Sequence, residues 1–207
     1  MEENLTLALK YRPKTLDEVI GNRQVVEVLR KQLSGESSQP LSHSILLHGP
    51  TGCGKTTLAR IIARELGVQD DDLKEIDSAD FRGIDTIREI RKQCQYKPLS
   101  SPYRVWILDE VHQLTKDAQS ALLKTLEDTP KHVYFILCTT DPQKLLPTIR
   151  GRCSQFQVQQ LTEKEMKRLL LRVVKAEGES LDKEVYEQIV QDSMGHPRNA
   201  LQILAQV

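Results

Sequence analysis

The chain has 207 residues, of which 28% are charged and 39% hydrophobic, proportions that are ordinary for a globular protein and exclude a disordered chain. Lys plus Arg and Asp plus Glu both total 29, so the net charge is zero. This balance excludes a globally basic nucleic-acid binder but allows a local basic face. No apolar run approaches the roughly 18 residues of a membrane-spanning helix, and the acidic N-terminal stretch does not resemble a secretory signal. We therefore expect no membrane contact.

The four cysteines stand alone in the sequence and form no C-x-x-C pair. This spacing argues against a metal site. We therefore expect reduced thiols, no zinc and a cytoplasmic location.

The chain begins with a polar lead-in, residues 1–21, in which Pro13 ends any helix begun at Leu5–Lys10. Asn22 is expected to cap the next helix. That helix is predicted at Arg23–Leu33, because apolar residues recur there on one face.

A phosphate-binding loop follows a strand predicted at Ser44–His48. Gly49–Thr56 reads G-x-x-x-x-G-K-T, and a helix predicted at 55–66 leads out of it. Glycines let successive backbone N–H groups face an anion, and the helix N-terminus adds donors and a positive dipole end. Lys55 would reach the β- and γ-phosphates, and Thr56 would coordinate Mg²⁺. The alternative is a glycine-rich turn that matches by chance. The nucleotide-binding residues expected in this segment are Gly49, Thr51, Gly52, Cys53, Gly54, Lys55, Thr56 and Thr57.

Strands and helices alternate over the next hundred residues. The pattern predicts strands at 73–76, 104–108, 133–138 and 153–158, and helices at 83–96 and 116–127, the second of them capped by Thr115. Such alternation is typical of an α/β fold, here a five-stranded parallel sheet with helices on both faces.

After Val158 the pattern changes to helices alone. Thr162 opens a capping box, and helices are predicted at 163–177, 182–192 and 197–206. We therefore expect two domains, an ATPase domain at 1–160 and a small helical lid at 161–207.

Two carboxylates, Asp109 and Glu110, end the apolar strand at 104–108. At the carboxyl end of a parallel strand they would emerge beside the phosphate loop. Asp109 would hold Mg²⁺, and Glu110 would orient and deprotonate the attacking water. The alternative is a solvated acidic pair at a strand end.

Three further polar residues are candidates for catalysis. Thr140 ends the fourth strand and could contact the γ-phosphate or the attacking water, or it could simply cap a turn. Arg152 could act on the γ-phosphate of a neighbouring subunit, and Arg198 could reach back from the lid to the nucleotide. For both arginines the alternative is an ordinary solvated side chain.

A basic set surrounds the helix predicted at 83–96, and such a face can follow nucleic-acid phosphates without reading bases, although most basic helix faces are merely solvated. His112, two residues after the acid pair, is expected to cap a helix or to hydrogen-bond in the core. The basic residues are Arg82, Arg88, Arg91 and Lys92.

At these residues the chain resembles the AAA+ ATPases of clamp loaders, in particular the bacterial DNA polymerase III gamma/tau subunits, with replication factor C small subunits as cousins. The matching pieces are collinear, cover roughly residues 8–205, and are most specific between Asp109 and Cys153. They are Lys10–Pro13, Gly49–Thr56, Glu75–Asp77 with Arg82–Asp85, Asp109–His112, Ala121–Glu127, Thr139–Leu145 and Gly151–Cys153.

The resemblance implies a role for each matching residue. Lys55 and Thr56 match Walker A, Asp109 and Glu110 match Walker B, Thr140 matches sensor 1, Arg152 matches the arginine finger, and Arg198 matches sensor 2. The stretch that packs on adenine is matched by Arg12, Pro13, Val19 and Ile20.

The resemblance also implies a function. The family hydrolyses ATP with Mg²⁺, opens a ring-shaped sliding clamp and places it on primer–template DNA during replication. Its partners are the other clamp-loader subunits, the clamp and the DNA, and an isolated module is expected to have low activity. The alternatives are another AAA+ machine, such as a DNA-remodelling or mobile-element ATPase, and a nucleotide-binding structural subunit.

The chain departs from the family pattern at three points. Gly151 stands where the family usually has Ser, next to the expected finger. The four-Cys zinc module found between the Walker motifs of bacterial relatives is missing. The C-terminal collar domain, which holds the family's pentamers together, is also not found in this sequence.

Overall fold

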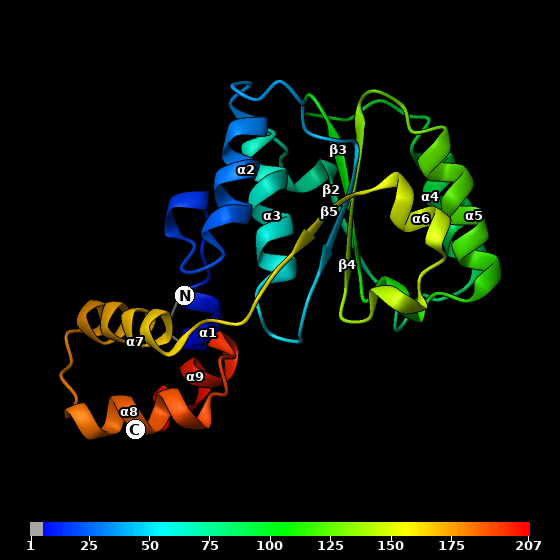
Figure 1. Cartoon of the computed structure of the whole chain (residues 1–207). Coiled ribbons are helices and arrows are strands. Elements are labelled where there is room, and N and C mark those ends of the chain that lie inside the picture. Colours follow the sequence, from blue (N-terminus) through cyan, green and yellow to red (C-terminus); the bar gives the residue numbers. More distant parts are fainter. Residues whose placement is uncertain (1–5) are drawn as a thin grey trace.

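The computed structural model describes residues 6–207, and its centre is a five-stranded, fully parallel sheet (Figure 1). The strand order is β2-β3-β4-β1-β5. The central strands are mostly apolar and are buried along nearly their whole length, because helices cover both faces of the sheet. The strands are β1 (Ser44–His48), β2 (Leu73–Asp77), β3 (Arg104–Asp109), β4 (Val133–Thr139) and β5 (Ser154–Gln157). The predicted α/β fold is confirmed.

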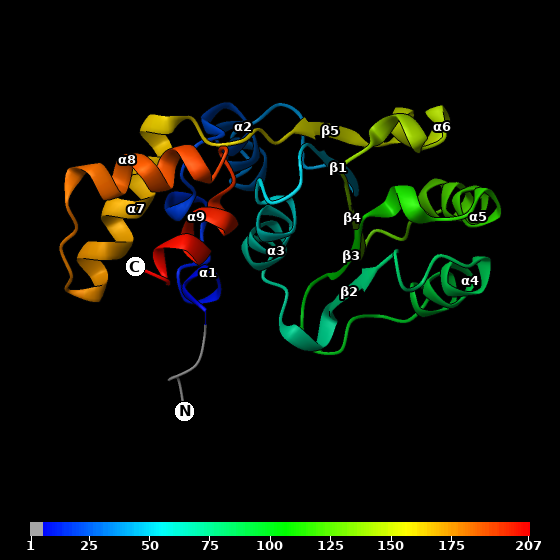
Figure 2. The same ribbon diagram turned by 90° about the horizontal axis from the view of Figure 1, so that it is seen from below.

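Helices pack against each face of the sheet, as Figure 2 shows from below. One face carries α2 (Arg23–Leu33) and α3 (Lys55–Glu65), and its core includes Leu29 and Ile61. The other face carries α4 (Ile84–Gln93), α5 (Lys116–Glu127) and α6 (Pro147–Arg152). The core on this face includes Ile87 and Leu122. Short 3₁₀ turns connect some of these elements: η1 (Leu16–Glu18), η2 (Asp70–Asp72), η3 (Val111–Gln113) and η4 (Pro142–Lys144).

A small helical lid stands beside the sheet and has its own apolar core, which includes Leu170 and Ile189 (Figure 1). Thr162 forms the expected capping box at its start, with Glu165 as the reciprocal partner. The lid consists of α7 (Glu163–Glu177), α8 (Lys183–Asp192) and α9 (Pro197–Leu204). Within residues 6–207, no helix combines the length and the apolar character that crossing a bilayer requires.

The polar lead-in contacts both the lid and the sheet layer, since its Leu16 belongs to the core on the α2 and α3 face of the sheet. Within its described residues, 6–21, the short helix α1 (Leu7–Lys10) packs against α9, and Tyr11 and Ile20 contact the lid core. The helix ends before Pro13 as expected, whereas the expected start at Leu5 lies outside the described residues. The first segment of the chain therefore bridges the lid and the sheet layer.

One predicted cap is wrong. Asn22 precedes α2, but its backbone is left-handed, with φ 51°, and its side chain makes no cap hydrogen bond. Instead, Asn22 Nδ2 donates to the Gln159 carbonyl at 3.1 Å, and Asn22 Oδ1 accepts from the Gln159 N–H at 2.7 Å. The side chain is thus used on the segment that connects β5 to the lid, a long-range contact that no local capping pattern contains.

The helix predicted at 83–96 is also shorter than expected, because a buried arginine captures the carbonyls that follow it. Arg104 Nη1 donates to the Gln93 carbonyl at 2.7 Å and to the Tyr96 carbonyl at 3.3 Å. The Arg104 Nη2 donates to the Lys97 carbonyl at 3.2 Å. The chain after Gln93 is therefore held as a loop instead of a further helical turn.

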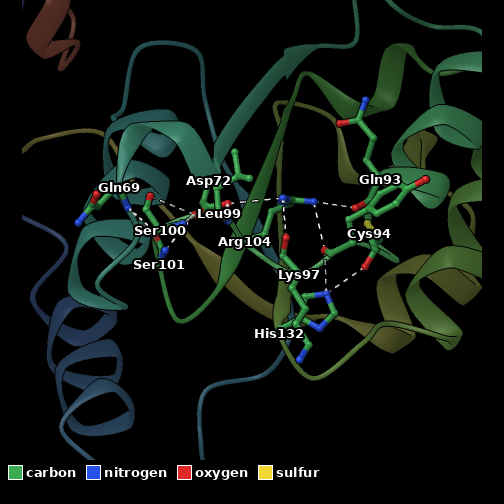
Figure 3. A network of polar contacts seen from close by, with 11 residues as sticks. Gln69, Asp72, Gln93, Cys94, Lys97, Leu99, Ser100, Ser101, Arg104 and His132 are labelled. Atoms are coloured by element: carbon green, nitrogen blue, oxygen red, sulfur yellow. Dashed lines mark hydrogen bonds and ion pairs between the residues drawn. The ribbon is translucent and has the colours of Figure 1, made fainter.

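Asp72 completes this network at the edge of the sheet where β3 begins (Figure 3). Its side chain is 0% exposed, and its carboxylate accepts backbone N–H groups from Leu99, Ser100 and Ser101 at 2.8–3.0 Å. Arg104 lies 3.5 Å from the same carboxylate. Burial raises the pKa of Asp72, but the hydrogen bonds from Ser100, Leu99 and Ser101 outweigh it and lower the pKa to about 2.

Replacing Asp72 should destabilise the fold without touching the opposite edge of the sheet. Asp72→Asn leaves Arg104 buried beside a neutral group and weakens the loop contacts, so we expect a loss of about 3 kcal/mol in the free energy of unfolding. Urea denaturation measures this loss, and the exposed neighbour Asp71 provides a matched control as Asp71→Asn. Because the pKa of Asp72 in the folded protein lies below its ordinary value of 3.8, the stabilisation is complete above pH 3.8 and disappears as the pH falls toward 2. Equal stability of the two variants would contradict this account.

Candidate functional site

The expected site residues gather at the carboxyl edge of the sheet. Strand β4 lies between β1 and β3, and His48 pairs with Thr139 while Leu108 pairs with Leu137, so the three strands end side by side. A cavity of about 580 Å³ opens there, between the phosphate loop, the lead-in and the lid. Its size falls within the range of small-molecule sites.

The phosphate loop requires glycine at two positions. Gly49 has φ 153°, and a Cβ atom there would lie 1.9 Å from the Val158 carbonyl oxygen. Gly54, the residue before α3, has φ 101°, a left-handed conformation that side chains other than glycine rarely adopt. Gly49 also donates its N–H to the Thr139 carbonyl at 3.2 Å, which ties the loop to the end of β4. All residues from Thr51 to Thr57 line the cavity.

The Lys55 side chain is held inside the loop. It is only 5% exposed, and its ammonium group donates to the carbonyls of Gly49 and Pro50, both at 2.9 Å. Burial of a cation is costly unless donors are satisfied, so a phosphate group would be a strong competing acceptor for this ammonium. The neighbouring Cys53 is buried as well, and burial raises the pKa of its thiol.

Thr56 and Asp109 meet across two elements. Thr56 Oγ1, in the first turn of α3, donates to Asp109 Oδ2, at the end of β3, at 2.6 Å. Two hard oxygen ligands at such a short separation fit Mg²⁺, which usually takes few protein ligands beside substrate phosphates. No cluster of three or more His, Cys, Asp or Glu side chains suited to a metal occurs within the described part of the chain, residues 6–207.

Glu110 has an unusual backbone. Its φ of 45° and ψ of 42° are left-handed, which is uncommon for a residue other than glycine and marks local strain. Its carboxylate Oε2 accepts a hydrogen bond from Thr140 Oγ1 at 3.1 Å, and its N–H donates to Asp109 Oδ1 at 3.0 Å. Thr140 does not line the cavity itself, so its contact with the site runs through Glu110.

The lead-in and the lid supply the opposite wall of the cavity. Arg12, Pro13, Val19 and Ile20 line it, together with Arg198 from the first turn of α9. Burial lowers the pKa of Arg12, and the nearby charges of Arg60 and Arg198 lower it further. Several positively charged groups are thus directed at one cavity.

Further residues line the cavity that were not predicted as site residues from the sequence. Asp77 ends β2 beside Asp109, and the rule that parallel strands end at one edge could have identified it. The lid residues that line the cavity, including Leu161, Leu169, Arg172 and Leu201, carry no local motif, because only the docking of the lid brings them there.

Arg152 does not enter the cavity of its own chain. It ends α6, on the far side of the sheet from the lid (Figure 2), and its guanidinium lies 2.6 Å from Glu127 at the end of α5. Its side chain remains 49% exposed. The expected finger is therefore on the surface.

The basic set near α4 is largely paired with acids. Arg88 lies 3.0 Å from Asp85, Arg91 lies 3.4 Å from Asp128, and Lys92 lies 3.9 Å from Glu89. All of these pairs are exposed and would exchange readily with other anions.

Comparisons with known protein families agree with the fold. A family model described as "DNA polymerase III, delta subunit" matches residues 68–162, and one described as "Magnesium chelatase, subunit ChlI" matches residues 15–106. Among curated proteins, the DNA polymerase III subunit gamma/tau of Mycobacterium tuberculosis is 37% identical over 98% of this chain. The tau subunit of Escherichia coli K12 is 34% identical over 97% of the chain.

The chain corresponds to part of these relatives. It spans 39% of the length of the Mycobacterium protein and 34% of the Escherichia protein. The shorter gamma subunit of Buchnera aphidicola from Schizaphis graminum is 35% identical over 96% of the chain, which spans 60% of that relative.

Solved structures of Thermotoga maritima RuvB have the same fold. The structure titled as a Holliday junction branch migration motor aligns with a TM-score of 0.76 and 28% identity, over 93% of this chain and 63% of that chain. A P216G mutant of the same protein aligns with a TM-score of 0.77 and 26% identity, over 92% of this chain and 64% of that chain.

The contact at Gly49 generates a test of the loop. Gly49→Ala places a Cβ atom against the Val158 carbonyl, so we expect the loop to shift and ATP affinity to fall by about 10-fold or more. Titration with a fluorescent ATP analogue measures the affinity, and Gly83→Ala, where a Cβ meets nothing within 4 Å, is the matched control. Unchanged binding by Gly49→Ala would show that the backbone here tolerates a side chain.

Proposed function

This AAA+ module belongs to the family of bacterial DNA polymerase III gamma/tau subunits, and from that premise we propose that it is an ATP-hydrolysing subunit of a clamp loader. In this role it helps to open a sliding clamp and to load it on primer–template DNA during replication. Because the chain spans only part of its relatives, the activity of a whole clamp loader is part of the proposal.

The contact between Thr56 and Asp109 is the observation that carries the proposal. It brings together an oxygen ligand from each Walker motif, as Mg²⁺–ATP requires. Lys55 would exchange its two loop carbonyls for phosphate oxygens, and Glu110 would accept a proton from the attacking water. Bound Mg²⁺ would supply charge neutralisation at the β- and γ-phosphates.

The lid and the lead-in would read the state of the nucleotide. We propose that Arg12, Pro13, Val19 and Ile20 hold the adenine end and that Arg198 contacts the phosphates from the lid. This is supported by their common position on the cavity wall. We also propose the boundary between the two domains at residues 160/161, next to the segment that Asn22 holds.

Arg152 would complete the site of a neighbouring subunit. Two observations support this role: the side chain lies outside its own cavity, and it is half exposed on a surface of the sheet layer. Glu127 would hold the guanidinium until a γ-phosphate of the neighbour competes for it, because an exposed ion pair is worth little.

We propose further partners from the same family membership. These are other clamp-loader subunits, a sliding clamp and primer–template DNA, whose phosphates could exchange with the acids that pair with Arg88, Arg91 and Lys92, next to Arg82. ATP and Mg²⁺ are the proposed cofactors, with no zinc, and a replication role implies a cytoplasmic location.

A second candidate is an ATPase of a DNA-remodelling machine. The likeness to the RuvB branch migration motor favours it, since its TM-score is 0.76 at 28% identity. Particle images of the assembled protein separate the two, because an open pentamer fits a loader and a closed hexamer fits a remodeller. A third candidate, a structural subunit that binds ATP without hydrolysis, is separated by the next experiment.

Glu110→Gln tests whether hydrolysis is the function. The amide cannot accept the proton of the attacking water, so we expect turnover to fall by about 10²–10⁴-fold while ATP affinity stays unchanged. The assay measures ATP hydrolysis by the assembled complex, with and without a clamp and primed DNA. A clamp loader should be stimulated by either addition. Equal background rates for wild type and variant in every assembly would instead support the structural subunit.

A mixing experiment tests the role of Arg152. Arg152→Ala subunits keep Glu110 but lack the finger, and Glu110→Gln subunits keep the finger but lack the base. If the finger acts across the interface, a mixture should regain hydrolysis that neither variant has alone, since fingers contribute about 10³–10⁵-fold. Arg152→Ala mixed with the doubly substituted chain, Glu110→Gln with Arg152→Ala, is the control. Recovery in that control, or none in the first mixture, would rule out action in trans.

A further inference from the structure

His112 contacts the proposed catalytic base. It lies in η3 (Val111–Gln113), directly after Glu110, and its side chain is only 8% exposed. His112 Nδ1 lies 3.2 Å from Glu110 Oε2 and 3.0 Å from Thr139 Oγ1. The sequence suggested only a cap or a core hydrogen bond for this residue, so its contact with Glu110 is unexplained by any role discussed above.

The neighbouring glutamine fixes which ring nitrogen carries the proton. Gln113 Nε2 lies 3.1 Å from His112 Nε2, and an amide nitrogen can only donate. With the Gln113 amide in this orientation, His112 Nε2 accepts, so in the neutral ring the proton is on Nδ1. That N–H faces Glu110 Oε2 and Thr139 Oγ1. Glu110 Oε2 thus accepts a hydrogen bond from Thr140 Oγ1, and His112 Nδ1 lies 3.2 Å from the same oxygen.

The other carboxylate oxygen is left for chemistry. Within residues 6–207, Glu110 Oε1 has no hydrogen-bond partner, whereas Oε2 accepts from Thr140 Oγ1 and lies close to His112 Nδ1. A base that uses one oxygen for support and the other for the proton is oriented before the substrate arrives, which is how a positioned base gains efficiency. The strained backbone of Glu110 is consistent with an orientation imposed by its surroundings.

We propose that His112 is a positioning residue for ATP hydrolysis, which fixes the Glu110 carboxylate through its Nδ1–H; this rests on the proposed function. The competing explanation is that His112 only supports η3 through its contacts with Thr139 and Gln113. The two explanations differ in what they predict for turnover when folding and nucleotide binding are intact.

The test compares His112→Phe with His112→Asn in the assembled ATPase. Phe keeps a ring but no donor, whereas the Asn amide places a donor near the position of Nδ1. Positioning predicts that His112→Phe lowers kcat by about 10- to 100-fold with unchanged ATP affinity, and that His112→Asn recovers most of the loss. His132→Phe is the matched control, because the His132 ring nitrogen Nε2 hydrogen-bonds to the Cys94 and Tyr96 carbonyls near the opposite end of β3, away from Glu110.

A double substitution separates positioning from structural support. In a Glu110→Gln background, His112→Phe should cause no further loss, because the base that His112 orients is already absent. An additive loss, an equal loss with His112→Asn, or a wild-type kcat for His112→Phe would overturn the inference while leaving the proposed function intact. If wild type does not hydrolyse ATP in any assembly, the proposed function fails and the inference with it.

A measurement that needs no substitution at His112 covers the case in which the His112 variants do not fold. In ¹⁵N-histidine NMR spectra, His112 should be the tautomer protonated on Nδ1, and its signal should shift on Glu110→Gln more than that of His132. An Nε2–H tautomer for His112, or no response to Glu110→Gln, would overturn the inference.

Discussion

The hydrogen bond between Thr56 and Asp109 depends on the order of the strands. These residues are 53 positions apart in the sequence and belong to a helix and a strand that do not follow one another. They meet because β4 inserts between β1 and β3, and all three strands run parallel and end at one edge. The sheet thereby converts separate sequence motifs into one oxygen-lined site, and the lid closes over the same edge.

The elements that follow from local chemistry could be predicted from the sequence. Thr115 and Thr162 cap their helices as expected, because both partners of each cap lie within one helical turn. The phosphate loop could be predicted for the same reason, since its glycines and its lysine are contiguous. The parallel sheet followed from the alternation of strands and helices, and the fold confirms it.

Contacts between distant segments could not be predicted in this way. Asn22 is of a residue type that often caps helices, yet its side chain hydrogen-bonds to the backbone of Gln159, far along the chain. Arg104 shortens the preceding helix by taking its carbonyls, which depends on a buried Asp72 as anchor. The lid residues that line the cavity could likewise not be predicted, because only the packing of the lid brings them to the site. In the candidate site, the residue types could be predicted from the sequence. That Thr140 contacts Glu110 instead of lining the cavity follows only from the tertiary structure.

The arginines around the cavity have an energetic consequence. Arg12 comes from the lead-in and Arg198 from the lid. Burial lowers the pKa of Arg12 most, and the positive charges of Arg60 and Arg198 lower it further. Like charges on two separate segments oppose the approach of those segments, and a polyanion between them reverses the sign of that interaction. Closure of the lid would therefore be more favourable with a triphosphate between the two arginines than after one phosphate leaves. Added salt would weaken this electrostatic effect before it disturbs the apolar cores of the lid and of the sheet layer.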